Sequence, residues 1–496
     1  MTTELGMAAA APVSGPTVET AAAPMLGAQA ERLVSLDVLR GITIAGMILV
    51  NNPGSWSKIF GPLEHAPWDG CTPTDLVFPF FLFMVGVAMT LSFDRRLARG
   101  ASRGKLFGHV VARSIVLILL GWVLSGFPNL RLISPFLLMI TGLQLLTREP
   151  SPPVQQGTKD RIAGNTERNP RERVWWLLSW ASLIAGVVWW LIDFRYFNGP
   201  TARGAFTDWW PTTPGGKNPL RVPGVLPRIG FCYFLASIVV LNTRWLGRII
   251  WAVILMLAYW ASMVYVHAPA GYVVGNGAPG ISIDARAGAP FPGTLNDWLD
   301  VRLLGRHLYS SRPDPEGLLS SIPAVATILI GTLIGTWILR KDLQRIRKAL
   351  GLVAAAALLV IAGLIWDHWF PINKKIWTSS YVLYTGGLAS GLLALCYCLC
   401  DIQGWRRWSV PFVVLGTNAI VAFFGSGLVA RLMGMIKWGE PDHETTLRGW
   451  LYAFYQSAFV NVKDGRWVSL AWAISYVALW VLLLVPLYRK RIFVRV

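Results

Sequence analysis

Residues 76–93 read LVFPFFLFMVGVAMTLSF, and this apolar run decides the fold class. An α-helix needs about 18 or more such residues to cross a hydrocarbon core roughly 30 Å thick. Comparable runs recur along the chain, which has 496 residues, of which 54% are hydrophobic and only 14% are charged. The sequence therefore predicts an all-α, polytopic integral membrane protein built as a helical bundle.

Twelve such runs predict twelve transmembrane helices. They lie at about 34–50, 76–93, 110–127, 132–147, 174–192, 225–241, 249–267, 318–339, 350–366, 379–400, 409–430 and 468–488. The run at 132–147 is short and contains Pro135, so it is predicted either as a span or as a re-entrant or interfacial segment. The expected number of spans is therefore about 10–12.

Basic residues in the short loops predict the orientation of the bundle. The loop from Asp94 to Arg113 carries six basic side chains against one acid, and basic loops recur at every second connection. The positive-inside rule places these loops, and with them both termini, in the cytoplasm. The loop that contains His65 is then expected outside, together with Asp193–Gly224, His267–Gly317, Asp367–Thr378 and Arg431–Trp467. We interpret the net charge of +19 as topology signals and contacts with anionic lipids, not as a nucleic-acid surface.

Composition also divides the chain. Residues 1–30 are rich in Ala, Pro and Thr and lack the basic and apolar regions of a signal peptide, which predicts a disordered tail ahead of one transmembrane domain at 31–496. Within that domain, 149–173 is expected as a cytoplasmic linker and 268–317 as an outer loop. Three of the five cysteines lie inside an apolar run, so neither a metal site nor a disulfide framework is expected.

The stretch His65-Ala66-Pro67-Trp68-Asp69-Gly70, just ahead of the run at 76–93, is where we expect the chemistry. Histidine gains or loses a proton near neutral pH, which suits a general base. Trp68 can supply a rigid apolar wall, and Asp69 or Asp75 can orient the imidazole. The alternative for His65 is an interfacial histidine held by a backbone carbonyl.

Polar residues at both ends of the first run are further candidates. Asp37 and Arg40 share a helix face and can neutralise each other at membrane depth. They belong either to a functional site or to a cap that anchors the helix at the inner interface. Asn51 and Asn52 either donate amide hydrogens to a substrate carbonyl, as oxyanion-hole groups do, or cap the end of the helix.

Three later positions also combine charge with apolar surroundings. Arg228 lies just inside an apolar run and is not expected to face lipid. Asp314 with Glu316, and Asn373 with Lys374, precede two further runs on the predicted outer side. These pairs either line a polar cavity or belong to solvated loops, and the sequence leaves both interpretations open.

These motifs follow one another in a fixed order over most of the chain. They are Ser35-Leu36-Asp37-Val38-Leu39-Arg40-Gly41, Val50-Asn51-Asn52, the His65–Gly70 stretch, Thr74-Asp75-Leu76-Val77-Phe78-Pro79, Gly224-Val225-Leu226-Pro227-Arg228, His307-Leu308-Tyr309, Asp314-Pro315-Glu316-Gly317, Asn373-Lys374 with Trp377, and Asn418. Together they resemble the heparan-α-glucosaminide N-acetyltransferase family of transmembrane acyltransferases. The departures are Pro227, where the family often has glutamine, two additional spans between Pro128 and Leu220, and the large lumenal N-terminal region of the animal enzyme, which is not seen here.

The resemblance implies that His65 is the catalytic residue and that Asp37 and Asn51 are also linked to activity. It further implies that cytosolic acetyl-CoA donates an acetyl group, without a metal, to the terminal glucosamine of a glycan across the membrane. Since the phosphates of CoA cannot cross hydrocarbon cheaply, the thioester arm must reach through the bundle. Contacts to substrate or acetyl-CoA are expected from the remaining candidates: Arg40, Asn52, Trp68, Asp69, Asp75, Arg228, Asp314, Glu316, Asn373 and Lys374.

The leading hypothesis is therefore an acetyltransferase of a bacterial inner membrane. It would acetylate an amino or hydroxyl group of an extracytoplasmic sugar, with His65 as the general base. The expected partners are acetyl-CoA, a sugar or glycan acceptor and the lipid bilayer, without nucleic acid, and a homodimer is left open. The alternative is a polytopic transporter or permease, which would use Asp37, Arg40 and Arg228 along its substrate path. A non-catalytic membrane assembly factor is a third interpretation.

Overall fold

The computed structural model of the chain describes residues 33–147, 170–197, 220–269, 272, 294–305, 307–309, 313–439 and 444–494. Contacts divide the chain into two units, Met1–Leu33 and Val34–Val496, and every described helix belongs to the second unit. The predicted tail at 1–30 lies outside the described residues, as do most of the predicted linker at 149–173 and much of the predicted outer loop at 268–317.

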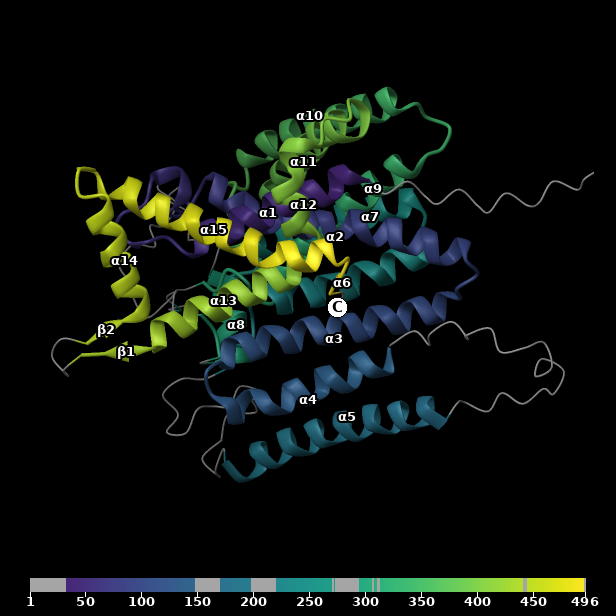
Figure 1. Cartoon of the computed structure of the whole chain (residues 1–496). Coiled ribbons are helices and arrows are strands. Elements are labelled where there is room, and N and C mark those ends of the chain that lie inside the picture. Colours follow the sequence, from purple (N-terminus) through teal and green to yellow (C-terminus); the bar gives the residue numbers. More distant parts are fainter. Residues whose placement is uncertain are drawn as a thin grey trace, which may run out of the picture. The chain divides into compact units, whose positions relative to one another are not determined.

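The described part of the second unit is almost entirely helical (Figure 1). Its α-helices are α1 (Val34–Asn51), α2 (Pro73–Ala98), α3 (Arg103–Gly126), α4 (Leu130–Leu146), α5 (Pro170–Phe197), α6 (Val225–Asn242), α7 (Trp245–Tyr265), α8 (Thr294–Leu304), α9 (Ser321–Leu339), α10 (Arg345–Asp367), α11 (Ser379–Tyr397), α12 (Val410–Thr417), α13 (Ala419–Met435), α14 (Leu447–Ala458) and α15 (Gly465–Arg489). A π-helical turn (Cys398–Ile402) continues α11, and single 3₁₀ turns lie at Gly61–Leu63 and Arg407–Ser409. Two short antiparallel strands, β1 (Lys437–Trp438) and β2 (Thr445–Thr446), precede α14.

Ten of the described helices are long and apolar enough to cross a membrane, or up to eleven if α12 and α13 together form one span. This confirms the predicted all-α polytopic bundle. The helix over the remaining predicted run, at 132–147, is the shorter apolar helix α4, so its crossing of the membrane stays a prediction.

The run at 409–430 is not the single straight helix that the sequence predicts. It breaks at Asn418, and α12 and α13 are bent by 73° relative to one another. The Asn418 side chain donates to the Ile492 carbonyl at 3.2 Å and accepts from the Val494 N–H at 3.0 Å. The C-terminal segment therefore supplies hydrogen bonds at the break, which local hydropathy cannot indicate.

Facing glycines let the central helices approach closely. A Cβ on Gly86 of α2 or on Gly331 of α9 would lie 2.1 Å from a carbonyl oxygen of the other helix. α1 and α12 meet in the same reciprocal way at Gly41 and Gly416. Small residues allow such close packing in membranes, where lipid tails remove the hydrophobic drive for helices to associate. These crossings position α1 and α2, which flank the His65 loop.

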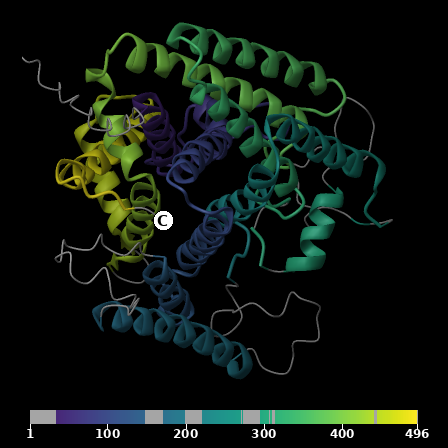
Figure 2. The same cartoon turned by 90° about the vertical axis from the view of Figure 1, so that its right-hand side faces the viewer.

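Burial differs strongly between helices. α9 contacts α2, α6, α7 and α11, and most of it is buried. α5 packs on α4, which packs on α3, and Figure 2 shows α5 at the edge of the unit. Most apolar side chains of α5 are exposed, including Trp175, Trp180 and Trp189. An apolar helix with so little protein around it suits contact with lipid.

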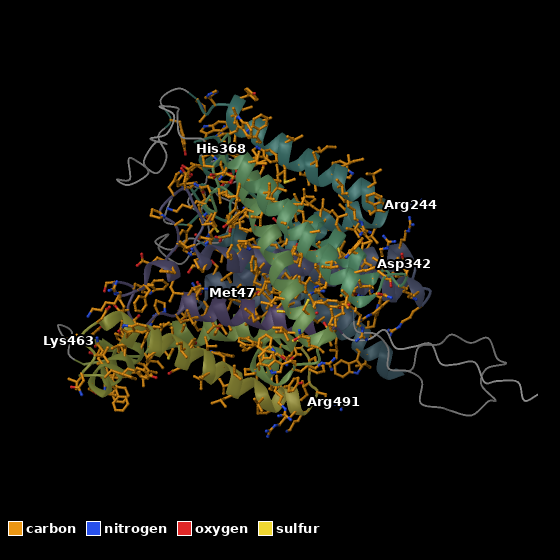
Figure 3. All side chains as sticks on the ribbon, turned by 90° about the horizontal axis from the view of Figure 1, so that it is seen from above. Met47, Arg244, Asp342, His368, Lys463 and Arg491 are labelled. Carbon is orange, nitrogen blue, oxygen red and sulfur yellow. The ribbon has the colours of Figure 1, made fainter. Side chains whose placement is uncertain are left out.

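The connecting segments gather at two ends of the bundle. In Figure 3, His368 and Lys463, from loops predicted outside, lie at one end, whereas residues from segments predicted inside lie at the opposite end: Arg244, Asp342 and Arg491. The predicted topology requires this division. Which end faces the cytoplasm stays a prediction.

Candidate active site

Asp75, in the first turn of α2, is the fixed centre of the site. Thr72 is the N-cap of this helix and Pro73 follows it, a sequence typical of a helix start. Asp75 Oδ2 accepts the N–H groups of Thr72 at 3.0 Å and Ala66 at 3.1 Å, and also the Thr72 hydroxyl at 3.0 Å. The Asp75 side chain is 1% exposed, so its second oxygen, Oδ1, is held in one direction.

His65 lies against that second oxygen. Its Nδ1 is 2.7 Å from Asp75 Oδ1, while the imidazole remains 51% exposed. Because an ionised carboxylate only accepts hydrogen bonds, Nδ1 donates to Asp75, and in the neutral imidazole Nε2 then keeps the lone pair. This is the arrangement of a histidine base whose ring is oriented by a carboxylate.

Lys374, from the loop between α10 and α11, reaches the same imidazole. Its Nζ lies 3.1 Å from His65 Nδ1, 3.2 Å from His65 Nε2 and 3.7 Å from Asp75 Oδ1. The lysine side chain is only 16% exposed. Burial lowers the pKa of Lys374 below its ordinary value, although the carboxylates of Asp75 and Glu316 act in the opposite direction. An imidazole, a carboxylate and an amine from two distant loops thus meet at one point.

A backbone bridge joins these two loops. The Gly70 N–H donates to the Ile372 carbonyl at 2.7 Å, and Gly70 pairs with Asn373 in a parallel bridge. Gly70 has a φ of +102°, a conformation that residues with a Cβ rarely adopt. The Asn373 amide donates to Asp69 Oδ1 at 3.3 Å. Asp69 and Asn373 therefore connect the loops, whereas Asp75 orients the imidazole.

Trp68 provides an apolar base for the histidine loop. It is 8% exposed and packs in a cluster with Tyr259 and Phe370. Lys375 Nζ lies 5.7 Å from the centre of the Trp68 ring and donates to the Pro67 carbonyl at 2.6 Å. The apolar cluster around Trp68 and the Lys375 cation over its ring together hold the histidine loop in place.

Arg228 of α6 faces the interior of the bundle. The residue is 2% exposed, and its guanidinium donates to Ser321 Oγ at 3.2 Å and to the carbonyls of Pro315 at 2.8 Å and Gly317 at 3.2 Å. The guanidinium carbon also lies 4.8 Å from the centre of the Trp377 ring. Arg228 thus holds the segment that leads into α9.

Asp314 and Glu316 share one arginine that the sequence did not single out. Arg221 donates to Asp314 Oδ1 at 2.7 Å and to Glu316 Oε2 at 2.5 Å. Asp314 also accepts the Tyr309 N–H at 2.7 Å and is 0% exposed. Of the two interpretations left open by the sequence, these acids therefore form a buried polar network and not a solvated loop. Glu316 is close enough to Lys374 to affect its pKa.

Asp37 and Arg40 lie near the other end of α1. At 1.5 Å per residue, Asp37 is about 21 Å from Asn51 along the helix. Arg40 Nη1 is 3.6 Å from Asp37 Oδ1 and donates to the Gly416 carbonyl at 3.4 Å, near the end of α12. A cation is favourable at the C-terminal end of a helix. The structure places this pair beside the break between α12 and α13, away from His65.

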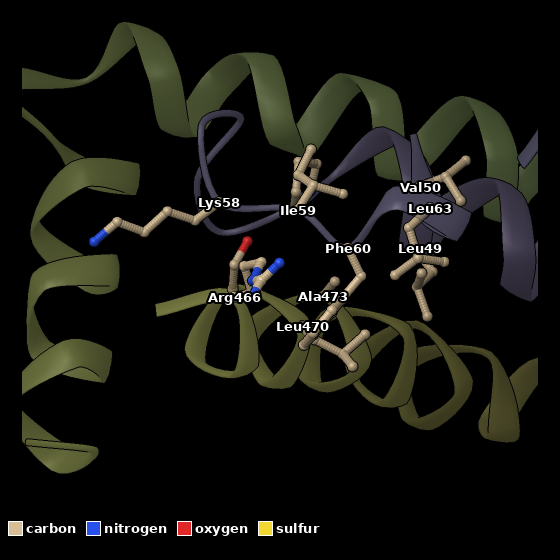
Figure 4. Close-up of a pocket in the computed structure, with 11 residues that line it drawn as sticks. Leu49, Val50, Lys58, Ile59, Phe60, Leu63, Arg466, Leu470 and Ala473 are labelled. Atoms are coloured by element: carbon tan, nitrogen blue, oxygen red, sulfur yellow. The ribbon is translucent and has the colours of Figure 1, made fainter. Parts of the chain in front are cut away.

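The two asparagines at the end of α1 differ in their surroundings. Asn51 is exposed, whereas Asn52 is 6% exposed and donates to the Ile48 carbonyl at 2.8 Å. A small pocket lies beside this end of α1, between the segment at 53–63 and the start of α15, with Lys58 and Arg466 among its mainly apolar lining residues (Figure 4). None of the predicted site residues lines this pocket.

Sequence reasoning missed residues that position the site. Thr72 could have been found, because threonine three residues before an acid and ahead of an apolar run is a capping pattern. Tyr381, whose hydroxyl donates to the Asp75 carbonyl at 2.5 Å, and Arg221 reach the site from distant segments that no local pattern marks. Within the described part of the chain, no group of three or more His, Cys, Asp or Glu side chains is placed to hold a metal ion.

Comparison with known proteins supports the resemblance seen in the motifs. No family model matches the chain. The chain is 25% identical over 513 residues to human heparan-alpha-glucosaminide N-acetyltransferase and 26% identical over 486 residues to the mouse protein of that name. Each match covers 94% of this chain, and the chain spans 60% of the length of either relative. The predicted resemblance to this family is confirmed, and both relatives are acyltransferases by name.

Proposed function

We propose that this chain, a relative of those two N-acetyltransferases, is a membrane-embedded acetyltransferase. It moves the acetyl group of acetyl-CoA to an amino or hydroxyl group of an extracytoplasmic sugar. The observation that carries the proposal is the contact of 2.7 Å between His65 Nδ1 and Asp75 Oδ1, which leaves Nε2 as a proton acceptor. The imidazole is 51% exposed, which leaves it open to an approaching acceptor.

The reaction needs a base, alignment of the reactants and stabilisation of charge. The acceptor gives its proton to His65 Nε2 as it attacks the thioester carbon, and the carbon–sulfur bond breaks. Asp75 stabilises the imidazolium that forms, and the imidazolium then returns the proton to the departing thiolate. An ordinary thiol has a pKa near 8.5, so its thiolate is a good leaving group. The thioester thus supplies the leaving group, His65 supplies the base, and Asp75 stabilises the imidazolium.

Arg40 is the candidate in this proposal for a contact with the phosphates of acetyl-CoA. It lies at the end of α1 predicted to face the cytoplasm, and its side chain is 27% exposed. Arg228 is no longer a candidate, because its guanidinium already binds the segment ahead of α9. Arg40→Gln is expected to raise KM for acetyl-CoA, with a smaller effect on kcat, in steady-state kinetics.

Consumption of acetyl-CoA by the purified full chain in lipid nanodiscs tests the proposal. With glucosamine as acceptor, we expect release of CoA and formation of N-acetylglucosamine, both dependent on His65. If the wild-type protein releases no CoA with amino-sugar or hydroxyl acceptors, the proposed activity is wrong.

The break between α12 and α13 favours a transporter, because discontinuous helices line substrate paths in many transporters. In this chain, Asn418 and Arg40 bind backbone carbonyls at the break. Sugar flux across proteoliposomes without consumption of acetyl-CoA would support the transporter.

A further inference from the structure

Lys374 holds a primary amine where the proposed acceptor would bring its own. A general base must lie within about 2.6–3.2 Å of the atom whose proton it takes. Lys374 Nζ is 3.2 Å from His65 Nε2, the nitrogen that keeps its lone pair. Nζ is almost equally distant from Nδ1, at 3.1 Å, so it lies off the axis of the Nε2 lone pair, and proton transfer requires the flexible lysine side chain to move toward the plane of the ring. The protein's own amine therefore lies beside the position of an acceptor.

The surroundings of Lys374 also favour its reactive form. An amine is nucleophilic only when it has lost its extra proton, and desolvation favours the neutral amine. Burial lowers the pKa of Lys374, while the carboxylates of Asp75 and Glu316 act against this, and Asp75 Oδ1 lies 3.7 Å from the amine. The adjacent Lys375 offers a contrast, since its Nζ donates to the Pro67 carbonyl and no hydrogen bond joins it to His65 in the described structure.

We propose that Lys374 is a site of self-acetylation, an inference that rests on the proposed function. When acetyl-CoA is bound without an acceptor, Lys374 Nζ attacks the thioester carbon, a carbon–nitrogen bond forms and the carbon–sulfur bond breaks. The proton released by the amine passes through His65 Nε2 to the leaving thiolate, so the products are acetyllysine and CoA. Acetylation removes the charge of Lys374 and leaves an acetyl group in the acceptor position. The modified enzyme is therefore inactive toward external acceptors.

The experiment uses the purified full chain in nanodiscs with acetyl-CoA and no acceptor. Mass spectrometry of its peptides follows one added acetyl group at Lys374 and at Lys375. We expect modification of Lys374 and not of Lys375, and slower modification when excess glucosamine competes. His65→Ala should slow the modification by about 10²-fold or more. Lys463→Arg, at an exposed lysine in another loop, is the control and should leave the modification of Lys374 unchanged.

The remaining outcomes would each contradict self-acetylation of Lys374, and they differ in what they imply for the proposed function. If the protein acetylates glucosamine but Lys374 stays unmodified, self-acetylation is wrong and the proposed function stands. Equal modification of both lysines, or modification that persists in His65→Ala at the wild-type rate, would show chemical acetylation by the thioester alone. An acetyl group on His65 only would indicate a covalent histidine route instead. If no acetyl-CoA is consumed, the proposed function and this inference are both wrong.

Discussion

At the scale of single residues, the orientation of the His65 ring depends on Asp75. Replacing either side chain should therefore lower the rate of acetyl transfer. His65→Ala removes the proton acceptor, so we expect kcat to fall by about 10²–10⁴-fold. Asp75→Asn keeps the shape but loses the charge and allows the wrong tautomer, for which a fall of about 10²-fold or more is expected. Steady-state release of CoA measures both effects.

Glu64→Gln is the matched control for these variants. Glu64 is an exposed acid next to His65 in the chain, and the described structure shows no hydrogen bond to its carboxylate. Its kcat should remain within about 2-fold of wild type, as expected for a surface change. Acetyl-CoA affinity should be close to normal in all three variants. Wild-type turnover by His65→Ala would refute the role of the histidine.

Asp300 of α8 predicts how stability depends on pH. Burial, together with the neighbouring acids Asp314 and Asp297, raises its pKa from 3.8 to about 7, although the Leu318 N–H and Arg228 oppose this. Between about pH 4 and pH 7 the folded protein holds a proton that the unfolded chain has lost. Stability therefore falls as pH rises through this window, by up to about 4 kcal/mol at 1.36 kcal/mol per pKa unit.

Thermal unfolding in nanodiscs at pH 5 and pH 8 tests this sign. The midpoint should be higher at pH 5, and Asp300→Asn, which cannot ionise, should reduce the difference between the two conditions. A wild-type midpoint that rises from pH 5 to pH 8 would contradict the assignment of Asp300.

At the scale of elements, the crossing of α2 and α9 depends on glycine. A Cβ on Gly86 would lie 2.1 Å from the Ile328 carbonyl oxygen, so the two helices must move apart. We expect Gly86→Ala to destabilise the fold by about 1–3 kcal/mol, as overpacked cores do. A Cβ on Gly108 of α3 would lie in open space, so Gly108→Ala should be neutral or stabilise by about 0.5–1 kcal/mol. Thermal unfolding that ranks the variants in the reverse order would contradict this packing.

The elements also show what the sequence can predict and what it cannot. Hydropathy is a local property, and each predicted run lies on helical structure. The break at Asn418 escaped prediction because its partners, Ile492 and Val494, come 74 and 76 positions later. In the same way Asp75, ten positions from His65, was a foreseeable partner, whereas Lys374 lies 309 positions away and was expected to contact acetyl-CoA. Long-range contacts of this kind leave no pattern in the neighbouring residues.

At the scale of the whole molecule, the two ends of the bundle predict opposite accessibility. Lys463 and Asp342 are exposed at opposite ends (Figure 3), and the basic loops predict that Asp342 faces the cytoplasm. In a chain whose five cysteines are replaced, Lys463→Cys should react with a membrane-impermeant maleimide on intact cells. Asp342→Cys should react only after permeabilisation. The reverse pattern of labelling would show that the orientation is opposite to the predicted one.

The meeting of His65 and Lys374 has a mechanical consequence. His65 lies in the loop between α1 and α2, and Lys374 lies in the loop between α10 and α11. The imidazole and the amine therefore meet only when these two helix pairs have matching positions along the membrane normal. Helices respond to a thinner or thicker bilayer by tilting, at a cost of fractions of a kcal/mol per Å. Such tilting would strain the hydrogen bond from Gly70 to the Ile372 carbonyl that joins the two loops, and it would move the amine relative to the ring. The contact between His65 and Lys374 is therefore sensitive to bilayer thickness, and self-acetylation of Lys374 should peak at one acyl-chain length and decline in both shorter and longer lipids.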